Sequence, residues 1–220
     1  MKITTAIFDM DGLLINSEPL WYEAAQECLT KFGITIAEEQ YVETTGLRTK
    51  EFLLHWFGVF DIDHAQIPAT EKEITDLVIA KVKDSGTMMD GVVEAMEIVK
   101  QSSLKVGLAS SSPLSLIKTV LDKTNMEQYF SAICSAEFLP FGKPNPQVFI
   151  NCAIELGSAP AACICFEDSF NGMIAAKAAR MKCIVVPHPD QYHQERWNIA
   201  DLRLNSLRSL TVQDFNALLV

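Results

Sequence analysis

The chain has 220 residues, enough for one large domain, or one domain with a small insertion, and for a full core without disulfide or metal cross-links. Hydrophobic residues make up 49% and charged residues 21% of the sequence, which is typical of a soluble globular protein and excludes an intrinsically disordered one. The net charge of −10 repels phosphate backbones, so we expect no nucleic-acid partner, whereas a few local cations can still hold a small anionic substrate.

Neither a membrane segment nor an oxidising compartment is indicated. The N-terminal apolar run is short and is broken by an acid, unlike a signal peptide, and no run of about 18 apolar residues could span a membrane. The six cysteines form no CxxC pair, and the four histidines do not supply zinc-ligand spacings. We therefore expect reduced, buried thiols in a cytoplasmic protein without a membrane partner, and the oligomeric state stays open.

Short apolar runs separated by helical patterns predict the core of the protein. A weaker run covers residues 132–135, and the four stronger ones are Ile3–Phe8, Lys105–Ala109, Cys163–Phe166 and Cys183–Pro187. Continuous apolar strands that alternate with helices are typical of a sheet with both faces covered. The sequence thus predicts an α/β sandwich with a mainly parallel sheet.

From about residue 17 to 85 helical patterns follow one another without a convincing strand. In the first pattern apolar residues recur at helical spacing up to Gly33, which is placed to end the helix. In the last, Thr70 and Glu73 form a capping box and Gly86 ends the pattern. A small helical unit is therefore inserted after the first strand. We expect its large aromatic residues to form its own core: Trp21, Phe52, Trp56 and Phe57.

Two carboxylates follow the first strand, in Asp9-Met10-Asp11-Gly12. On an extended chain residues i and i+2 project to the same side, and at the carboxyl end of a parallel strand they open into the ligand crevice. Close carboxylates repel each other and so favour a divalent cation, while Gly12 lets the chain turn away sharply. The alternative is an acidic turn without a function.

Three serines and a proline, Ser110 to Pro113, follow the second strand. Ser112 and Pro113 suit the N-cap and the first turn of the next helix, so capping alone can explain Ser112. Hydroxyls and amides at a strand end and a helix N-terminus also suit a phosphate group. Both interpretations remain open from these residues alone.

A single cation lies in a stiff loop, Gly142-Lys143-Pro144-Asn145-Pro146. The two prolines restrict the loop and place the start of the next helix at about Pro146. A lysine on such a loop can present one fixed charge to a phosphate, although a lone lysine in a loop is usually solvated.

Two further acids, Glu167 and Asp168, follow the apolar run 163–166. Alone, they could cap the next helix and complement its dipole. Together with the other strand ends, however, they complete a set of carboxylates, hydroxyls and one ammonium. Phosphoryl transfer needs these groups, because it uses a nucleophile, a metal site, and cations and donors for the phosphoryl oxygens.

The order and spacing of these motifs resemble the haloacid dehalogenase superfamily of phosphotransferases over nearly the whole chain. The resemblance is strongest to the sugar-phosphatase branch that includes β-phosphoglucomutase and the phosphatases of hexitol and 2-deoxyglucose 6-phosphates. The segments that carry it are Asp9–Glu18, Gly107–Pro113, Leu139–Phe149 and Glu167–Met181. It implies a Rossmann-like parallel sheet sandwiched by helices in residues 1–15 and 88–220, with residues 16–87 as a small mobile α-helical cap.

The resemblance also implies a role for each motif residue. It makes Asp9 the nucleophile and Asp11 the general acid and base, both in contact with the substrate. It assigns the transferred phosphoryl oxygens to Ser110, the Ser111 amide and Lys143. The groups implied to hold Mg²⁺ are Asp9, Asp168, the main-chain carbonyl of Asp11 and, nearby, Glu167. The expected activity is Mg²⁺-dependent hydrolysis of a small phosphorylated sugar or polyol through an aspartyl phosphate, and the sequence does not identify which one.

Two positions in the expected cap leave alternatives open. Arg48, in Gly46-Leu47-Arg48 between two predicted helices, either reaches down to the substrate or stays a surface or capping residue. Asn16 stands where the family often has Asp, in a segment that here reads Asn16-Ser17-Glu18. Because this segment lies at the cap hinge, outside the four motifs, the change concerns electrostatics near the cap rather than catalysis.

Three other functions compete with the phosphatase. A phosphomutase would share all four motifs, but the β-phosphoglucomutase relatives have a cap histidine where this chain has Trp21, which favours hydrolysis. A non-catalytic phospho-receiver module would need neither Asp11 nor the helical insertion. A dehalogenase would need no Mg²⁺, and those relatives lack the second acid of the first motif, which is Asp11 here.

Overall fold

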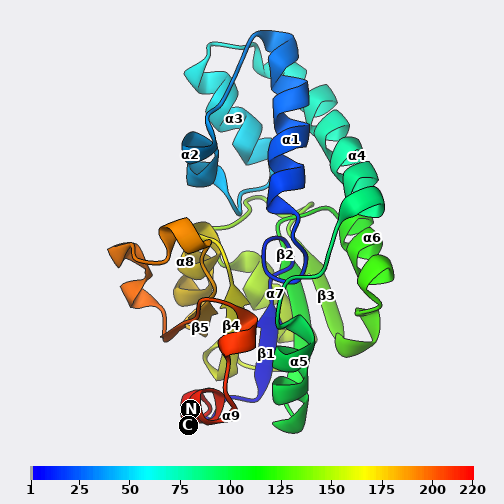
Figure 1. The fold of residues 1–220 in the computed structure, drawn as a ribbon. Coiled ribbons are helices and arrows are strands. Elements are labelled where there is room, and N and C mark those ends of the chain that lie inside the picture. The colour runs from blue at the N-terminus through cyan, green and yellow to red at the C-terminus, as the bar shows by residue number, and fades with distance from the viewer. Residues whose placement is uncertain (1) are drawn as a thin grey trace.

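Six parallel strands form one sheet in the computed structural model, which describes residues 2–220 (Figure 1). The strands are β1 (Thr5–Phe8), β2 (Lys105–Ser110), β3 (Ala132–Ser135), β4 (Cys163–Glu167), β5 (Lys182–Val185) and β6 (Leu202–Arg203). Their order across the sheet is β3-β2-β1-β4-β5-β6, and every neighbouring pair runs parallel. The predicted parallel α/β sheet is confirmed, with the predicted runs as β1 to β5. The sequence does not predict β6, because two half-buried residues carry no periodicity.

Helices cover both faces of the sheet. One face carries α7 (Gln147–Glu155) and α8 (Phe170–Ala178), and the other carries α5 (Val92–Gln101), α6 (Leu114–Thr124) and α9 (Val212–Leu218). Neighbouring residues of one strand therefore enter different clusters: Ile7 packs with α7 and α8, whereas Phe8 packs on the opposite side. Phe8 also stacks on Phe166 of β4, with ring centroids 4.2 Å apart. Burial on both faces is why these strands are apolar along their whole length.

Four helices gather above the carboxyl end of the sheet (Figure 1). They are α1 (Glu18–Leu29), α2 (Glu38–Tyr41), α3 (Thr49–Val59) and α4 (Ile67–Ser85), and α4 also lies against α6. We refer to residues 18–85 as the helical unit and to the rest of the described chain as the sheet domain. Phe52, Trp56 and Phe57 are buried in it, as predicted for its own core. Trp21 differs, because its ring is only partly buried and also borders a cleft.

The predicted helix ends at the two glycines are confirmed, whereas one predicted helix start is wrong. Gly33 ends the turn after α1 in the left-handed conformation with φ +73°, and Gly86 follows the last residue of α4. The capping box predicted at Thr70 is wrong, since α4 begins at Ile67. The hydroxyl of Thr70 instead donates to the carbonyl of Gln66 at 2.9 Å, within the helix.

The helical unit joins the sheet through two segments that lie side by side. The amide of Asn16 donates to the carbonyl of Thr87 at 2.8 Å, and the amide of Met89 donates to the carbonyl of Leu14 at 3.0 Å. The chain therefore leaves the sheet domain and returns to it at one place. Asn16 takes part through its backbone, and its side chain is exposed.

Two further sequence-based expectations concern the chain as a whole. All six cysteines are buried and unpaired, as expected of reduced thiols. Within residues 2–220, no helix combines the length and the apolar character needed to cross a membrane.

Candidate active site

The polar residues after β1, β2 and β4 meet at the carboxyl end of the sheet, because these strands are neighbours. Asp9 directly follows β1, Ser110 ends β2, and Glu167 ends β4. A cleft lies between this edge and the helical unit. Its lining includes Asp9, Asp11, Ser111 and Asp168 from the sheet side and Glu18, Trp21, Tyr41 and Arg48 from the helical side. The fold thus brings all the sequence-predicted motifs to one place.

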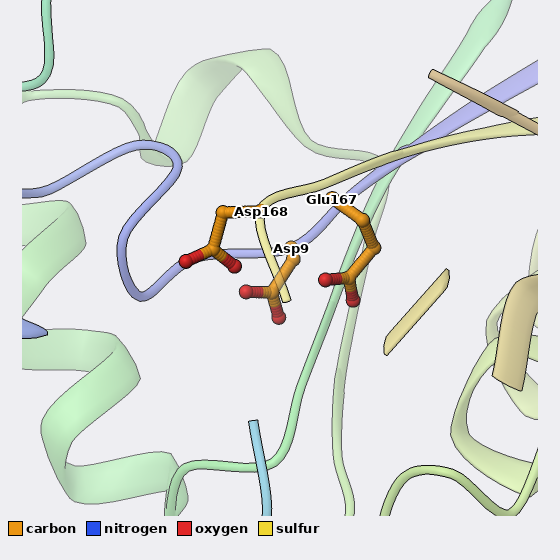
Figure 2. A group of neighbouring side chains, drawn as sticks. All are labelled: Asp9, Glu167 and Asp168. Carbon is orange, nitrogen blue, oxygen red and sulfur yellow. The ribbon is translucent and has the colours of Figure 1, made fainter. Parts of the chain in front are cut away.

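Three carboxylates gather at this edge (Figure 2). Asp9, Glu167 and Asp168 each offer an oxygen, and these oxygens all lie within 4.8 Å of one another. Two glycines permit this approach. Gly12 has φ +69°, and a Cβ atom there would overlap the Asp168 carboxylate. A Cβ atom at Gly172, in the first turn of α8, would likewise overlap the Glu167 carboxylate.

Lys143 brings a positive charge into this group of acids. Its side chain is buried, and its Nζ donates to Asp9 Oδ1 at 2.5 Å, Glu167 Oε1 at 2.6 Å and the Ala109 carbonyl at 3.1 Å. The ammonium also lies 4.7 Å from the centre of the Phe149 ring. With an acceptor for each of its protons, Lys143 is a fixed cation of the site rather than a solvated loop residue.

One ammonium does not balance the charge of three carboxylates. Burial raises the pKa of Asp9 to about 8, and the charges of Glu167 and Asp11 add to this against the opposing effect of Lys143. Burial, followed by the charges of Asp9 and Glu167, also raises the pKa of Asp168 well above its usual range. A further positive charge would stabilise the ionised form of both groups.

Mg²⁺ fits this group of residues. The available donors are carboxylate oxygens, which this hard cation prefers, and their surplus negative charge matches a divalent ion. Glu167 is the least free of the three, because Oε1 accepts from Lys143 and Oε2 accepts from Ser169 Oγ at 3.1 Å. The place of Glu167 near the ion therefore stays a prediction, whereas Asp9 and Asp168 keep oxygens outside the Lys143 contact.

Asp11 lies between the sheet and the helical unit. Its Oδ1 accepts from Ser17 Oγ at 2.7 Å and from Trp21 Nε1 at 2.9 Å. Its Oδ2 accepts from Ser112 Oγ at 2.6 Å, with Ser110 Oγ at 3.5 Å. Uncharged donors thus hold the carboxylate in one orientation at the cleft.

The capping role predicted for Ser112 is wrong. Pro113 is the residue that precedes α6, and the first amide of that helix, that of Leu114, donates to the Glu137 carboxylate at 3.1 Å. Ser112 is buried and donates to Asp11 instead, because a hydrogen bond to a carboxylate is stronger than one to a neutral backbone group. Of the other two serines, Ser110 accepts from the Ser112 amide at 3.0 Å, and Ser111 donates to the Gly46 carbonyl in the helical unit at 2.8 Å.

Arg48 lines the cleft but is fully engaged with protein groups. Its guanidinium forms a two-point ion pair with Glu51. It also donates to the carbonyls of Ala136 at 2.9 Å, Leu139 at 2.6 Å and Pro140 at 3.3 Å. Every N–H group of Arg48 therefore has an acceptor, and its direct contact with a substrate stays a prediction.

Sequence reasoning assigned no role to Glu18 and Tyr41, which both line the cleft. Burial, with the charges of Asp11 and Asp9, raises the pKa of Glu18 to about 8. Burial and the Glu18 charge also raise the pKa of Tyr41 well above its usual range. The available signal for Glu18 was an acid one helical turn before Trp21, on the same face of α1. No sequence signal distinguishes Tyr41 from a core aromatic residue.

Comparison with known proteins places these motifs in a family. The family model of haloacid dehalogenase-like hydrolases matches residues 6–186, which include every motif described above. Hexitol phosphatase B of Escherichia coli strain K12 is 42% identical over 221 residues, and the match covers 97% of this chain and 96% of that protein. A phosphorylated carbohydrates phosphatase of Thermotoga maritima is 29% identical over 178 residues, with 81% of this chain and 82% of that protein covered.

A solved structure agrees with the fold. The β-phosphoglucomutase of Clostridium difficile superimposes with a TM-score of 0.86 over 98% of this chain and 96% of that one. The two sequences are 22% identical in this comparison. The similarity therefore concerns the arrangement of sheet and helical unit.

Proposed function

Since this chain belongs to the haloacid dehalogenase-like hydrolase family and is a phosphoric monoester hydrolase, we propose that it removes phosphate from small sugar or polyol phosphates. The proposed reaction is Mg²⁺-dependent and passes through an aspartyl phosphate on Asp9. The observation that carries this proposal is the buried contact of Lys143 with Asp9 beside Asp168, at the carboxyl end of neighbouring strands. It combines a nucleophile, a fixed cation and a group of metal-binding oxygens in one cleft.

The proposed substrate class rests on similarity and on the lining of the cleft. The 42% identity to hexitol phosphatase B extends over nearly the full length of both proteins. The cleft also offers groups that pair with sugar or polyol hydroxyls, since Glu18 and Tyr41 lie beside Thr44 and Thr45. A substrate of this class would place its phosphate at Asp9 and its hydroxyl-bearing part against the helical unit.

In the first proposed step Asp9 attacks phosphorus. A bond forms from an Asp9 carboxylate oxygen to phosphorus while the bond from phosphorus to the sugar oxygen breaks. Asp11, which lies at the cleft, gives its proton to the departing oxygen. Lys143, the Ser110 hydroxyl and the Ser111 amide hold the phosphoryl oxygens and stabilise the charge that develops on them.

In the second proposed step water hydrolyses the aspartyl phosphate. Asp11, now ionised, accepts a proton from the attacking water, which forms a bond to phosphorus as the bond to Asp9 breaks. This step returns Asp9 to its carboxylate form and Asp11 to its protonated form. Both carboxylates are thus used twice in one turnover.

Mg²⁺ would be held by Asp9, Asp168 and the main-chain carbonyl of Asp11, with Glu167 next to them. When bound, it supplies positive charge that offsets the repulsion between Asp9 and a phosphate dianion. Glu167 contributes through Lys143, because its carboxylate is hydrogen-bonded to that ammonium.

We further propose that residues 16–87 act as a cap over a core of residues 1–15 and 88–220. The paired segments at Asn16 and Thr87 are the connection about which such a cap would move. In the closed arrangement the cap excludes bulk water and contacts the part of the substrate that leaves. Selectivity for the leaving group would then reside in the cap and the phosphoryl chemistry in the core.

A phosphate-release screen of the purified protein with Mg²⁺ tests the proposal. The panel contains hexose and hexitol phosphates, nucleotides and phosphoglycolate, with the Asp9→Asn variant as the matched control. We expect release from hexose or hexitol phosphates in the wild type only. Isomerisation of β-glucose 1-phosphate would favour a phosphomutase. A phosphoenzyme that persists for many minutes, with no turnover of any ester, would favour a phospho-receiver module.

A further inference from the structure

The two oxygens of Asp11 face different parts of the molecule. Oδ1 accepts from Ser17 and Trp21, and Trp21 belongs to α1 of the helical unit. Oδ2 accepts from Ser112 and lies 3.5 Å from Ser110, and both of these serines belong to the sheet domain. The side chain of Asp11 is thus oriented jointly by the two parts of the protein.

The partners of the two oxygens also differ chemically. An indole N–H can only donate, so Asp11 Oδ1 has to be an acceptor wherever it meets Trp21. A serine hydroxyl rotates and can accept as well as donate. Because a carbonyl oxygen accepts better than a protonated one, the indole favours a proton on Asp11 Oδ2, beside Ser110 and Ser112, which line the same cleft.

Trp21 is well suited to hold this orientation. Its ring is packed against the hydrophobic cluster that runs through the helical unit and the sheet domain, and it also borders the cleft. Since an indole has only two side-chain torsions, packing of the ring also directs the N–H group. Through its hydrogen bond of 2.9 Å to Asp11, the position of α1 therefore determines how the carboxylate is oriented.

We propose that Trp21 is a positioning residue for Asp11, which holds Oδ1 as an acceptor and leaves Oδ2 to deliver the proton. This inference rests on the phosphatase function proposed above. As the Asp9 oxygen bonds to phosphorus, the electron pair of the breaking bond goes to the leaving oxygen, and the proton passes to it from Asp11 Oδ2. Because Trp21 lies in the helical unit, its hydrogen bond to the acid forms only while that unit rests against the sheet.

The test compares two substrates of nearly the same shape in the Trp21→Phe variant, which keeps an aromatic ring and removes the N–H donor. Phenyl phosphate needs a proton on its leaving oxygen, whereas p-nitrophenyl phosphate has a leaving group that departs readily without one. The value measured is kcat/KM in the presence of Mg²⁺, which covers the steps up to leaving-group departure. We expect kcat/KM to fall about tenfold or more for phenyl phosphate and less than about twofold for p-nitrophenyl phosphate.

The matched control is Trp197→Phe. This variant also loses an indole hydrogen bond, of 2.9 Å to the Gln191 carbonyl, but lies in the core of the sheet domain. Its ratio of kcat/KM for the two esters should equal that of the wild type. Both esters are measured on one sample, so a smaller folded fraction lowers both values equally and leaves the ratio unchanged.

Two results would overturn the positioning role while the proposed function stands. One is an equal fall of kcat/KM for both esters in Trp21→Phe, and the other is no fall for either. If the wild type instead releases phosphate from neither ester nor from any sugar phosphate, the proposed function fails, and the role of Trp21 fails with it.

Discussion

Lys143 is buried in the site and still carries its charge. Burial alone would lower its pKa, but the charges of Asp9 and Glu167 and the hydrogen bonds to them raise it above its usual value. Removing one partner from a buried ion pair costs about 3–5 kcal/mol, since it leaves an uncompensated charge behind. Lys143 therefore contributes to the stability of the site, in addition to the phosphate-binding role proposed for it.

At the same scale, Asp9→Asn should abolish turnover and leave the fold intact. The amide keeps the shape of the side chain and can still accept from Lys143, but it lacks the negative charge needed for attack. Phosphate release from the best sugar phosphate and the melting temperature are measured for both proteins. If the variant kept more than about a tenth of wild-type kcat, the difference in barrier would be under about 1.4 kcal/mol, and Asp9 would not be the nucleophile.

Lys143→Ala should lower kcat by about a hundredfold or more, and Lys143→Arg should not restore it. The ammonium donates to three acceptors that converge on a single atom, namely Asp9, Glu167 and the Ala109 carbonyl. A planar guanidinium is longer and cannot place its charge at that point. Steady-state kinetics of both variants test this, and wild-type activity in Lys143→Arg would contradict a specific role for the ammonium.

At the scale of elements, the segment before α3 connects the helical unit to the sheet domain. Gly46 accepts from Ser111, and Thr45 accepts from Asn171 Nδ2 at 2.8 Å. Arg48 then donates to carbonyls of residues 136–140, while its partner Glu51 accepts from the Gly142 amide at 2.9 Å. Segment 45–48 and the first turn of α3 thus lie against the loop that precedes Lys143.

Arg48→Ala should therefore change substrate selectivity more than phosphoryl chemistry. Loss of its contacts weakens the closed arrangement, which a sugar phosphate needs for alignment of its leaving oxygen. A small aryl phosphate should depend less on the helical unit, because the residues proposed to hold its phosphate, Lys143 and Ser110, belong to the sheet domain. We expect kcat/KM to fall about tenfold or more for a hexose 6-phosphate and a hexitol phosphate and much less for p-nitrophenyl phosphate.

Arg208→Ala is the control for this prediction. Arg208 also forms an ion pair, with Asp90, but it is exposed and outside the cleft. It should leave the ranking of all three substrates unchanged. A uniform fall for Arg48→Ala would assign Arg48 to the core chemistry or to stability, and no change would make it a residue without influence on catalysis.

At the scale of the whole molecule, the buried acids connect stability to pH and metal. The pKa values of Asp9 and Glu18 are both raised to about 8, so the folded protein binds more protons than the unfolded chain between about pH 4 and 8. Their contribution to stability is fully present below the unfolded pKa values. It is lost as the pH rises through about 8.

In EDTA, the melting temperature should therefore decrease between pH 5 and pH 9. Because the proposed Mg²⁺ site consists of ionised carboxylates, Mg²⁺ should raise the melting temperature more at pH 8 than at pH 5. Asp168→Asn should remove most of this increase, and Glu18→Gln should make the decrease in EDTA shallower. A melting temperature in EDTA that is constant over this range would contradict the raised pKa values.

Much of the fold and of the candidate site could be predicted because the signals are local. A strand covered on both faces, such as β1 or β4, needs a continuous apolar run whatever the rest of the chain does. In a parallel sheet the carboxyl ends of the strands meet at one edge, so acids placed after those runs have to come together. The ends of the strands, and the gathering of polar residues at those ends, could therefore be predicted from the sequence.

Only the tertiary structure decided which partners the polar side chains take. Ser112 could have capped the helix beside it or donated to the carboxylate of Asp11, which lies about a hundred residues earlier in the chain. In the structure it donates to Asp11. From the sequence, Trp21 was expected to be a core residue of the helical unit. In the structure, the position of α1 over the sheet directs the N–H of Trp21 to Asp11. Arg48 donates hydrogen bonds to carbonyls of the loop at residues 136–139, which is far from it in the sequence. The direction of a side chain depends on the packing of elements far apart in sequence, and no local pattern records that packing.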